Sequence, residues 1–269
     1  MRNLRLILSY DGSEFSGWQV QPDRATVQGT LASAIGRLTG ENVLPQGSGR
    51  TDAGVHALAQ VANFPTASAI PAGNWLKALN DILPASIRVL EASEAAADFH
   101  ARKSARAKTY RYRMYRGAIC PPFLARYVWH YPFPLQQDEM AEAAGLVVGE
   151  HDFTSFAAVD PERVERVVPK ENMNHREHGE IQRKPENQGT NVRTIFSSAW
   201  SREGEEIVYA VRGNGFLHHM VRNLVGTFLL VGKGTLAPED FRRIVAARDR
   251  SAAGPTAPAS GLYLAGVEY

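Results

Sequence analysis

The residues best suited to chemistry lie in the stretch 47–57, GSGRTDAGVHA, which combines three glycines with one arginine and one carboxylate. Glycines allow positive φ angles and the close approach of another molecule. Arg50 and Asp52 are two residues apart, so in an extended segment they point to the same side. Such a loop could present an ionised and oriented aspartate. A tight turn with a surface ion pair is the plainer interpretation of the same residues.

Two other regions hold groups that could act with this carboxylate. Residues 99–137 contain eight Lys and Arg and no Asp or Glu, and aromatic residues such as Tyr110 lie among them. This pattern is typical of a phosphate-facing surface and also of a solvated strand face. Arg222 is the one fixed charge in an apolar helix expected near residues 217–231. Tyr110 could equally be half-buried core, and Arg222 could be a helix-end charge that reaches water.

Chemistry on a nucleotide base would use all three groups together. The base must leave its stack, and an aromatic ring must receive it. A guanidinium must hold the carboxylate ionised and correctly aimed. An ionised Asp52 beside arginines could then act as a nucleophile rather than as an acid.

Other familiar sites are missing from the sequence. It contains no Gly-x-x-x-x-Gly-Lys-Ser/Thr, His-Glu-x-x-His, Cys-x-x-Cys or Gly-x-Ser-x-Gly motif. His218 and His219 are adjacent, so on a helix their side chains project in different directions. We therefore expect packing or surface positions for this pair, not a metal site.

The elements that must position these groups alternate along the first hundred residues. A helix begins after the N-cap Thr26 and ends at Gly40, and a second helix covers residues 74–83. Apolar alternation predicts strands over residues 4–10, 55–64 and 87–90. The resulting order βαβαβ predicts an α+β fold with helices packed on one sheet.

The rest of the chain again alternates strands and helices. Strands are expected over residues 108–115 and 262–269, a hairpin around Glu203-Gly204, and helices over 136–148, 217–231 and 240–248. Within 108–115 the period of two separates Lys108, Tyr110, Tyr112 and Met114 from Arg111, Arg113 and Tyr115.

Domain organisation follows from the composition between these elements. We place a boundary after Ala97, which predicts an N-terminal domain of residues 1–98 with the aspartate loop and a C-terminal domain of residues 99–269. Residues 168–190 are polar and contain no aromatic residue, so we expect a flexible loop insertion there.

Composition limits the cellular setting. The single cysteine, Cys120, excludes an internal disulfide framework and fits a reducing compartment. The first residues lack the apolar core of a secretory signal, and no apolar run is long enough to span a bilayer. We expect a soluble, cytoplasmic protein without a membrane partner.

A series of short motifs, taken in order, resembles the bacterial tRNA pseudouridine synthase A family. The resemblance covers essentially the whole chain, residues 49–57 (GRTDAGVHA) are its most specific part, and the segment near 170–190 is extra length. The other matching motifs are YDG (10–12) with Phe15, GWQ (17–19), TVQ (26–28), ALN (78–80), FHAR (99–102), Lys108 with Tyr110, and the segments 213–217, 220–226 and 256–264.

The family resemblance implies a reaction, a fold and partners. It implies the isomerisation of uridine to pseudouridine in the anticodon stem-loop of tRNA, at tRNA positions 38, 39 and 40, with neither a cofactor nor a metal. The implied fold has two ferredoxin-like (RRM-like) α+β subdomains whose antiparallel sheets abut, with a basic cleft between them. The implied assembly is a homodimer.

The same resemblance implies roles for individual residues. Asp52 is similar to the family's catalytic aspartate, and Arg50 belongs to the same motif. Tyr110 matches the active-site tyrosine, and Arg222 matches the arginine that pairs with the aspartate. Substrate-binding positions are expected at Leu262, as an apolar wall beside the base, and at Lys108 and Arg102.

Alternatives remain open at this point. Asp52 could form an adduct with the ribose or abstract its 2′ proton, and Tyr110 could stack on the base or take the C5 proton. A non-catalytic RNA-binding module would explain the basic strand and Tyr110. It would gain nothing from Asp52, because negative charge weakens RNA binding. An aspartate-dependent nucleosidase would need a water path to C1′.

Overall fold

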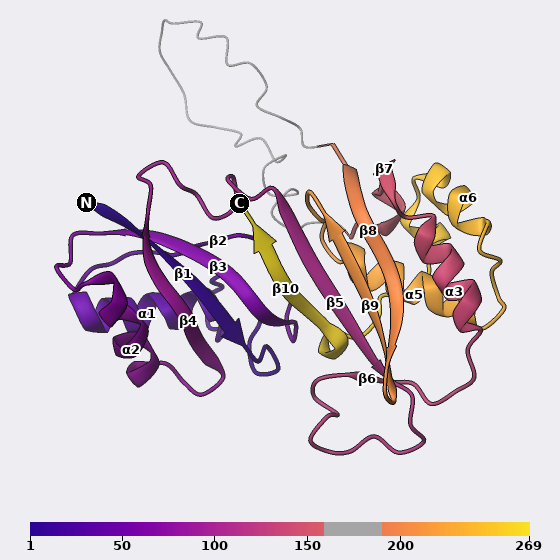
Figure 1. Ribbon diagram of the computed structural model, residues 1–269, viewed down its shortest axis with the longest axis horizontal. Helices are drawn as coiled ribbons and strands as arrows, with labels where there is room; N and C mark the ends of the chain where they lie inside the picture. Colours follow the sequence, from indigo (N-terminus) through magenta and orange to yellow (C-terminus); the bar gives the residue numbers. More distant parts are fainter. Residues whose placement is uncertain (159–189) are drawn as a thin grey trace, which may run out of the picture.

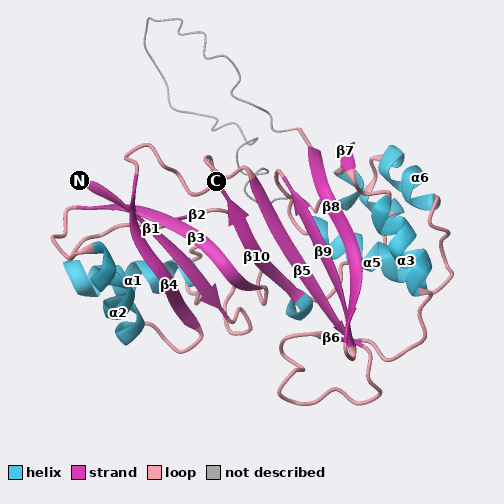
Figure 2. Ribbon diagram, viewed as in Figure 1, coloured by secondary structure: helices cyan, strands magenta, loops and turns pink. Residues whose placement is uncertain are grey.

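The computed structural model describes residues 1–158 and 190–269. The described part contains ten strands in one sheet, with helices packed against it (Figures 1 and 2). The strands are β1 (Arg2–Tyr10), β2 (Gln46–Gly47), β3 (His56–Thr66), β4 (Ile87–Ala95), β5 (Ala107–Tyr115), β6 (Trp129–His130), β7 (Gly149–Asp152), β8 (Val192–Glu203), β9 (Glu206–Gly213) and β10 (Leu262–Glu268). The α-helices are α1 (Val27–Thr39), α2 (Ala72–Ile82), α3 (Gln137–Gly145), α5 (Met220–Gly232) and α6 (Asp240–Ala247). The predicted α+β fold is confirmed.

The closing strand β10 joins the two parts of the sheet. The strand order is β4-β1-β3-β10-β5-β9-β8-β7, so β10 lies between β3 and β5 (Figure 1). It runs antiparallel to β5 but parallel to β3, where Tyr263 is paired with His56 and Leu264 with Ala57. Strands β4-β1-β3 and strands β10-β5-β9-β8-β7 each form the expected antiparallel sheet, and the parallel contact between β3 and β10 is where the two sheets abut. The two sheets are hydrogen-bonded into one mixed sheet, because a strand contributed late in the chain supplies the shared edge.

One face of this sheet carries the apolar core. Strand register aligns Tyr10, Ala57, Leu264 and Tyr110 in a row that crosses the junction of the two parts. All four side chains are buried, as the alternation of strand residues between two faces requires. Hydrophobic burial against this face therefore holds the fold together on both sides of β10.

The helices pack on the same face as this row. Trp75 of α2 contacts Phe64 of β3 at a ring distance of 5.4 Å, and Phe228 of α5 contacts Tyr209 of β9 at 5.1 Å. Register places Phe64 opposite Leu4 and Tyr209 opposite Tyr112, which share the face of Tyr10 and Tyr110. Both groups of helices therefore lie on the face of the sheet that carries Tyr10 and Tyr110.

Local signals at the helix ends explain where two of the helices begin and end. The Thr26 hydroxyl accepts a hydrogen bond from the Gly29 amide, and Gly40 ends α1 in the left-handed region, so the predicted first helix is confirmed. Helix α5 begins at Met220, three residues later than expected. His219 just before it has a φ of 59°, which prevents the helix from starting earlier.

Two predictions about chain organisation have different outcomes. Strand β4 continues to Ala95 because it pairs with β1 as far as Asn3. The strand predicted over residues 87–90 therefore ended too early. The insertion expected over residues 168–190 lies, except for Thr190, outside the described residues. The boundary after Ala97 stays a prediction. Among the described residues, no helix has both the length and the apolar character needed to cross a membrane.

Candidate active site

The Asp52 loop is held by the segment that follows β1. The Trp18 amide donates to the Thr51 carbonyl at 3.0 Å, and the Gly54 amide donates to the Phe15 carbonyl at 3.3 Å. Gly17, with a φ of 87°, passes so close that a β carbon there would lie 2.6 Å from the Thr51 carbonyl oxygen. This contact requires glycine for both reasons, backbone conformation and space. The loop is therefore a fixed support for Asp52.

Two hydroxyl groups fix the loop above the row of buried residues. The Tyr10 hydroxyl lies 2.9 Å from the Thr51 hydroxyl, in a fully buried contact.

Lys108 of β5 also supports the loop, because its Nζ donates to the Ser48 carbonyl at 2.6 Å. Burial, reinforced by the positive charges of Arg102 and Arg193, lowers the pKa of Lys108 to about 8. Lys108 thus belongs to the support of the loop, which the sequence pattern had not indicated.

Asp52 and Arg222 form an ion pair across the junction of the two parts of the sheet. Nη1 of Arg222 lies 3.0 Å from Oδ2 of Asp52, and the two side chains are 14% and 19% exposed. Nε of Arg222 donates to the Ala257 carbonyl at 2.7 Å, which orients the guanidinium. The predicted contact between Arg222, the one fixed charge of the apolar helix, and Asp52 is therefore present. A largely buried arginine needs such a partner, since an unpaired buried charge is costly.

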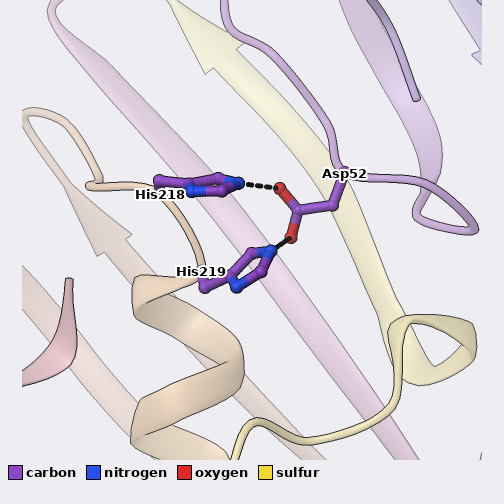
Figure 3. A group of neighbouring side chains, drawn as sticks. All are labelled: Asp52, His218 and His219. Atoms are coloured by element: carbon purple, nitrogen blue, oxygen red, sulfur yellow. Dashed lines mark ion pairs between the residues drawn. The ribbon is translucent and has the colours of Figure 1, made fainter. Parts of the chain in front are cut away.

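His218 and His219 also reach the carboxylate of Asp52, one at each oxygen (Figure 3). Nε2 of His218 lies 3.5 Å from Oδ1, and Nε2 of His219 lies 3.3 Å from Oδ2. The expectation that these side chains diverge into packing or surface positions is wrong. Neither residue is helical, and the left-handed backbone at His219 turns its ring toward that of His218, with ring centres 4.0 Å apart. The signal missed in the sequence was the position of the pair immediately before a helix start.

Tyr110 and Leu262 are the residues that we expected to form the apolar part of the site. Both are buried, on neighbouring strands β5 and β10. The ring of Tyr110 packs edge-on against Phe216, at 5.0 Å between centres. Burial, together with the nearby Tyr10 and Asp52, raises the pKa of the Tyr110 phenol well above its ordinary value. Tyr110 therefore stays protonated and is poorly suited to accept a proton.

The arginines of the basic run do not form one surface. Arg111 and Arg113 lie on the strand face opposite Tyr110, as the period of two predicts. They pair with glutamates of the neighbouring hairpin, Glu203 at 2.5 Å and Glu206 at 2.6 Å. These two positions fit the alternative of a solvated strand face. Arg50 and Arg102 are exposed, so they remain available candidates for RNA contacts.

A second polar cluster lies next to the site and was not predicted. His56, the second-last residue of the stretch 47–57, is buried, and its ring stacks on that of Tyr263 with 4.8 Å between ring centres. Its Nδ1 accepts from the Gly12 amide at 3.1 Å and lies 3.2 Å from Asp11, which in turn accepts from the Tyr127 hydroxyl at 2.9 Å. Since Nδ1 is an acceptor, the ring proton lies on Nε2, which faces the Arg126 carbonyl at 3.2 Å.

The geometry supports chemistry at a sugar or base more than simple binding. A carboxylate lies between a guanidinium and two imidazoles, and the loop that carries it is fixed by backbone hydrogen bonds. A buried tyrosine and a buried leucine lie on adjacent strands nearby. Together these groups define an enzyme type of site in which a held carboxylate can act on a substrate.

Comparison with known proteins agrees with this class. The sequence matches the tRNA pseudouridine synthase family over residues 6–102 and 175–269. It is 48% identical to the tRNA pseudouridine synthase A of Solibacter usitatus and 44% identical to that of Brevibacillus brevis, in both cases over the full length of both chains. It is 46% identical to that of Moorella thermoacetica over 99% of each chain. The chain belongs to the tRNA pseudouridine synthase family, isomerases that convert uridine to pseudouridine.

Proposed function

We propose that this protein isomerises uridines of the tRNA anticodon stem-loop, at positions 38, 39 and 40, with Asp52 as the group that acts at the ribose. The observation that carries the proposal is the ion pair between Asp52 and Arg222, which are 170 residues apart in the chain. Two distant segments supply a carboxylate and its orienting guanidinium at one point. A pure RNA-binding surface has no use for that arrangement, because the carboxylate repels phosphate.

In this reaction the bond between ribose C1′ and uracil N1 breaks, the uracil turns in place, and C1′ is rejoined to C5. The C5 proton leaves and N1 gains a proton, so no oxidant or co-reactant is needed. Asp52 acts at the sugar, and Arg222 orients its carboxylate. A pocket closed to water must retain the free uracil while it turns.

Tyr110 and Leu262 would hold the uracil during its rotation. The raised pKa of Tyr110 keeps its phenol neutral, which favours stacking over proton transfer from C5. Leu262 lies on the neighbouring strand as an apolar side chain. Among the basic residues, the exposed Arg50 and Arg102 are the proposed contacts to the RNA backbone, and Lys108 supports the loop from below. The basic cleft and the homodimer implied by the family resemblance, and the cytoplasmic location expected from the composition, are part of this proposal.

The test is tritium release from tRNA that carries tritium at C5 of its uridines. Isomerisation releases the label to water, and the released amount should match the number of pseudouridines mapped to positions 38, 39 and 40. Free uracil that still carries the tritium, with no label in the water and no pseudouridine, would identify a nucleosidase. Tight tRNA binding without release would identify an RNA-binding module. Light scattering of the purified protein measures the mass of the expected homodimer.

A further inference from the structure

The three polar side chains of Figure 3 form a set of metal ligands around one point. One ligand atom each from Asp52, His218 and His219 lies within 4.8 Å of the others. Two imidazoles and a carboxylate are a common ligand set for Zn²⁺ and related ions, in sites that keep a fourth position open.

The separations between these atoms match the geometry of a tetrahedral ion. Ligands at 2.0–2.1 Å from a tetrahedral Zn²⁺ lie about 3.3 Å from one another. Nε2 of His218 lies 3.5 Å from Oδ1 of Asp52 and Nε2 of His219 lies 3.3 Å from Oδ2, and one ligand atom from each residue lies within 4.8 Å of the others, so small side-chain rotations would bring three ligands around one ion. An ion could therefore enter with little movement of the protein.

The backbone holds both rings in this arrangement. His219 is one of three described non-glycine residues with a positive φ, and this conformation turns two sequence neighbours to the same side. The rings lie 4.0 Å apart and are 34% and 27% exposed, so ions in solution can reach them.

Arg222 does not block such a site. Its Nη1 lies 3.0 Å from Oδ2 of Asp52, the oxygen that His219 also faces, whereas Oδ1 faces His218. A carboxylate has enough lone pairs to serve a guanidinium at one oxygen and a metal ion at the other. The ion would then occupy the atoms that the isomerisation needs.

We propose that Asp52, His218 and His219 bind a divalent transition-metal ion such as Zn²⁺ in the RNA-free protein, and that the bound ion reversibly inhibits the isomerase. The ion is an inhibitor and not a cofactor, because it takes up the carboxylate that must act at the ribose. The inhibition rests on the function proposed above for Asp52, whereas the binding rests on the ligand geometry alone.

The binding is tested with Co²⁺, whose visible absorption reports tetrahedral coordination. We expect an absorption band on titration of the metal-free protein, which Zn²⁺ removes by displacement. His218→Gln and His219→Asn should each weaken Co²⁺ binding at least about tenfold. Asparagine is chosen at His219 because it tolerates the left-handed conformation, and melting curves verify that both variants fold. His151→Gln, at a histidine of β7 outside the site, is the matched control and should bind as the wild type does. Absence of the band, or an equal band in both variants, overturns the proposed site.

The inhibition is tested by adding Zn²⁺ to the tritium-release assay. We expect inhibition that EDTA reverses and that excess tRNA shifts to higher Zn²⁺ concentrations. Metal binding without inhibition would overturn the inhibitory role but leave the site intact. If the protein released no tritium even without metal, the proposed function would fail, and the Co²⁺ spectrum would still decide whether the site exists.

Discussion

Two aspartate–histidine clusters lie near the junction of the sheet, and they use their polar atoms differently. In the Asp11 cluster, backbone and hydroxyl groups of Gly12, Ser13 and Tyr127 satisfy the aspartate and His56. The His56 side chain is 2% exposed. In the Asp52 cluster the carboxylate contacts a guanidinium and two imidazoles, all partly open to solvent.

The difference distinguishes a cluster that stabilises the fold from one that is available for chemistry. Neutral hydrogen-bond donors satisfy the carboxylate of Asp11. The contact of Asp11 with Tyr127 and that of His56 with Arg126 connect this cluster to residues 126–127. Arg222, His218 and His219 contact Asp52 but leave its carboxylate partly exposed to solvent. The type of donor and the exposure of the histidines separate the two clusters, since the aspartates themselves are similarly exposed.

The largest expected effect separates the two aspartates directly. Asp52→Asn should lower turnover at least about a thousandfold, because the group that acts at the ribose is lost. Its affinity for tRNA should be unchanged or slightly higher, because one repulsive charge is removed. Asp11→Asn should keep turnover within about tenfold but lower the free energy of unfolding by about 1–2 kcal/mol. Tritium release and urea unfolding measure the two quantities, and an inactive Asp11→Asn beside an active Asp52→Asn would reverse the assignment.

The next effect tests how Tyr110 is used. If its ring stacks on the uracil, Tyr110→Ala should lower turnover about 10- to 100-fold, as the loss of base stacking predicts. Tyr110→Phe keeps the ring and should stay within about tenfold of the wild type. A large loss in Tyr110→Phe, measured by tritium release from folded protein, would show that the hydroxyl takes part in proton transfer.

A smaller effect tests the buried histidine through pH. Burial is the main cause of the lowered pKa of His56, so the unfolded chain binds the proton more readily than the folded protein. The contribution of His56 to stability is therefore present above pH 6.5 and is lost as the pH falls toward its folded-state pKa. One such group contributes at most about 1.4 kcal/mol per pH unit. His56→Gln should remove this part of the slope in urea unfolding, whereas the control His151→Gln should keep it.

The smallest effect concerns the salt dependence of tRNA binding. Arg102→Gln should reduce the slope of log affinity against log salt by about one, if the exposed Arg102 contacts one phosphate. Arg111→Gln should leave the slope unchanged, because Arg111 pairs with Glu203 on the opposite face of its strand. Binding titrations at several salt concentrations give both slopes. Equal slopes for wild type and Arg102→Gln would place the RNA elsewhere.

The local pattern of the sequence was enough to predict much of this site. The glycine-rich stretch and the single charge in an apolar helix singled out Asp52 and Arg222, and the family resemblance implied that they pair, as the structure shows. Alternation within 108–115 assigned Tyr110 and Arg111 to opposite faces. Each of these conclusions depends on residues close together in the chain or on a charge that needs a partner.

Features that depend on strand register or on a single backbone angle could not be predicted in this way. The left-handed conformation at His219 brings both histidines to Asp52, and adjacent letters in a sequence do not reveal it. The pairs Arg111–Glu203 and Arg113–Glu206 arise from the alignment of β5 beside the β8–β9 hairpin. The parallel contact of β10 with β3 likewise depends on where the last strand docks.

The coupling between Asp52 and Arg222 tests the central claim most directly, through a double-mutant cycle in urea unfolding. Their ion pair is largely but not fully buried, so Arg222→Met should cost about 1–3 kcal/mol, between the values for buried and exposed pairs. Adding Asp52→Asn should recover part of this loss but none of the activity. Arg113→Met, whose partner is Glu206, should combine additively with Asp52→Asn as the control. If the effects of Arg222→Met and Asp52→Asn simply add, the two residues are not coupled, and a single active site built from both parts of the chain is contradicted.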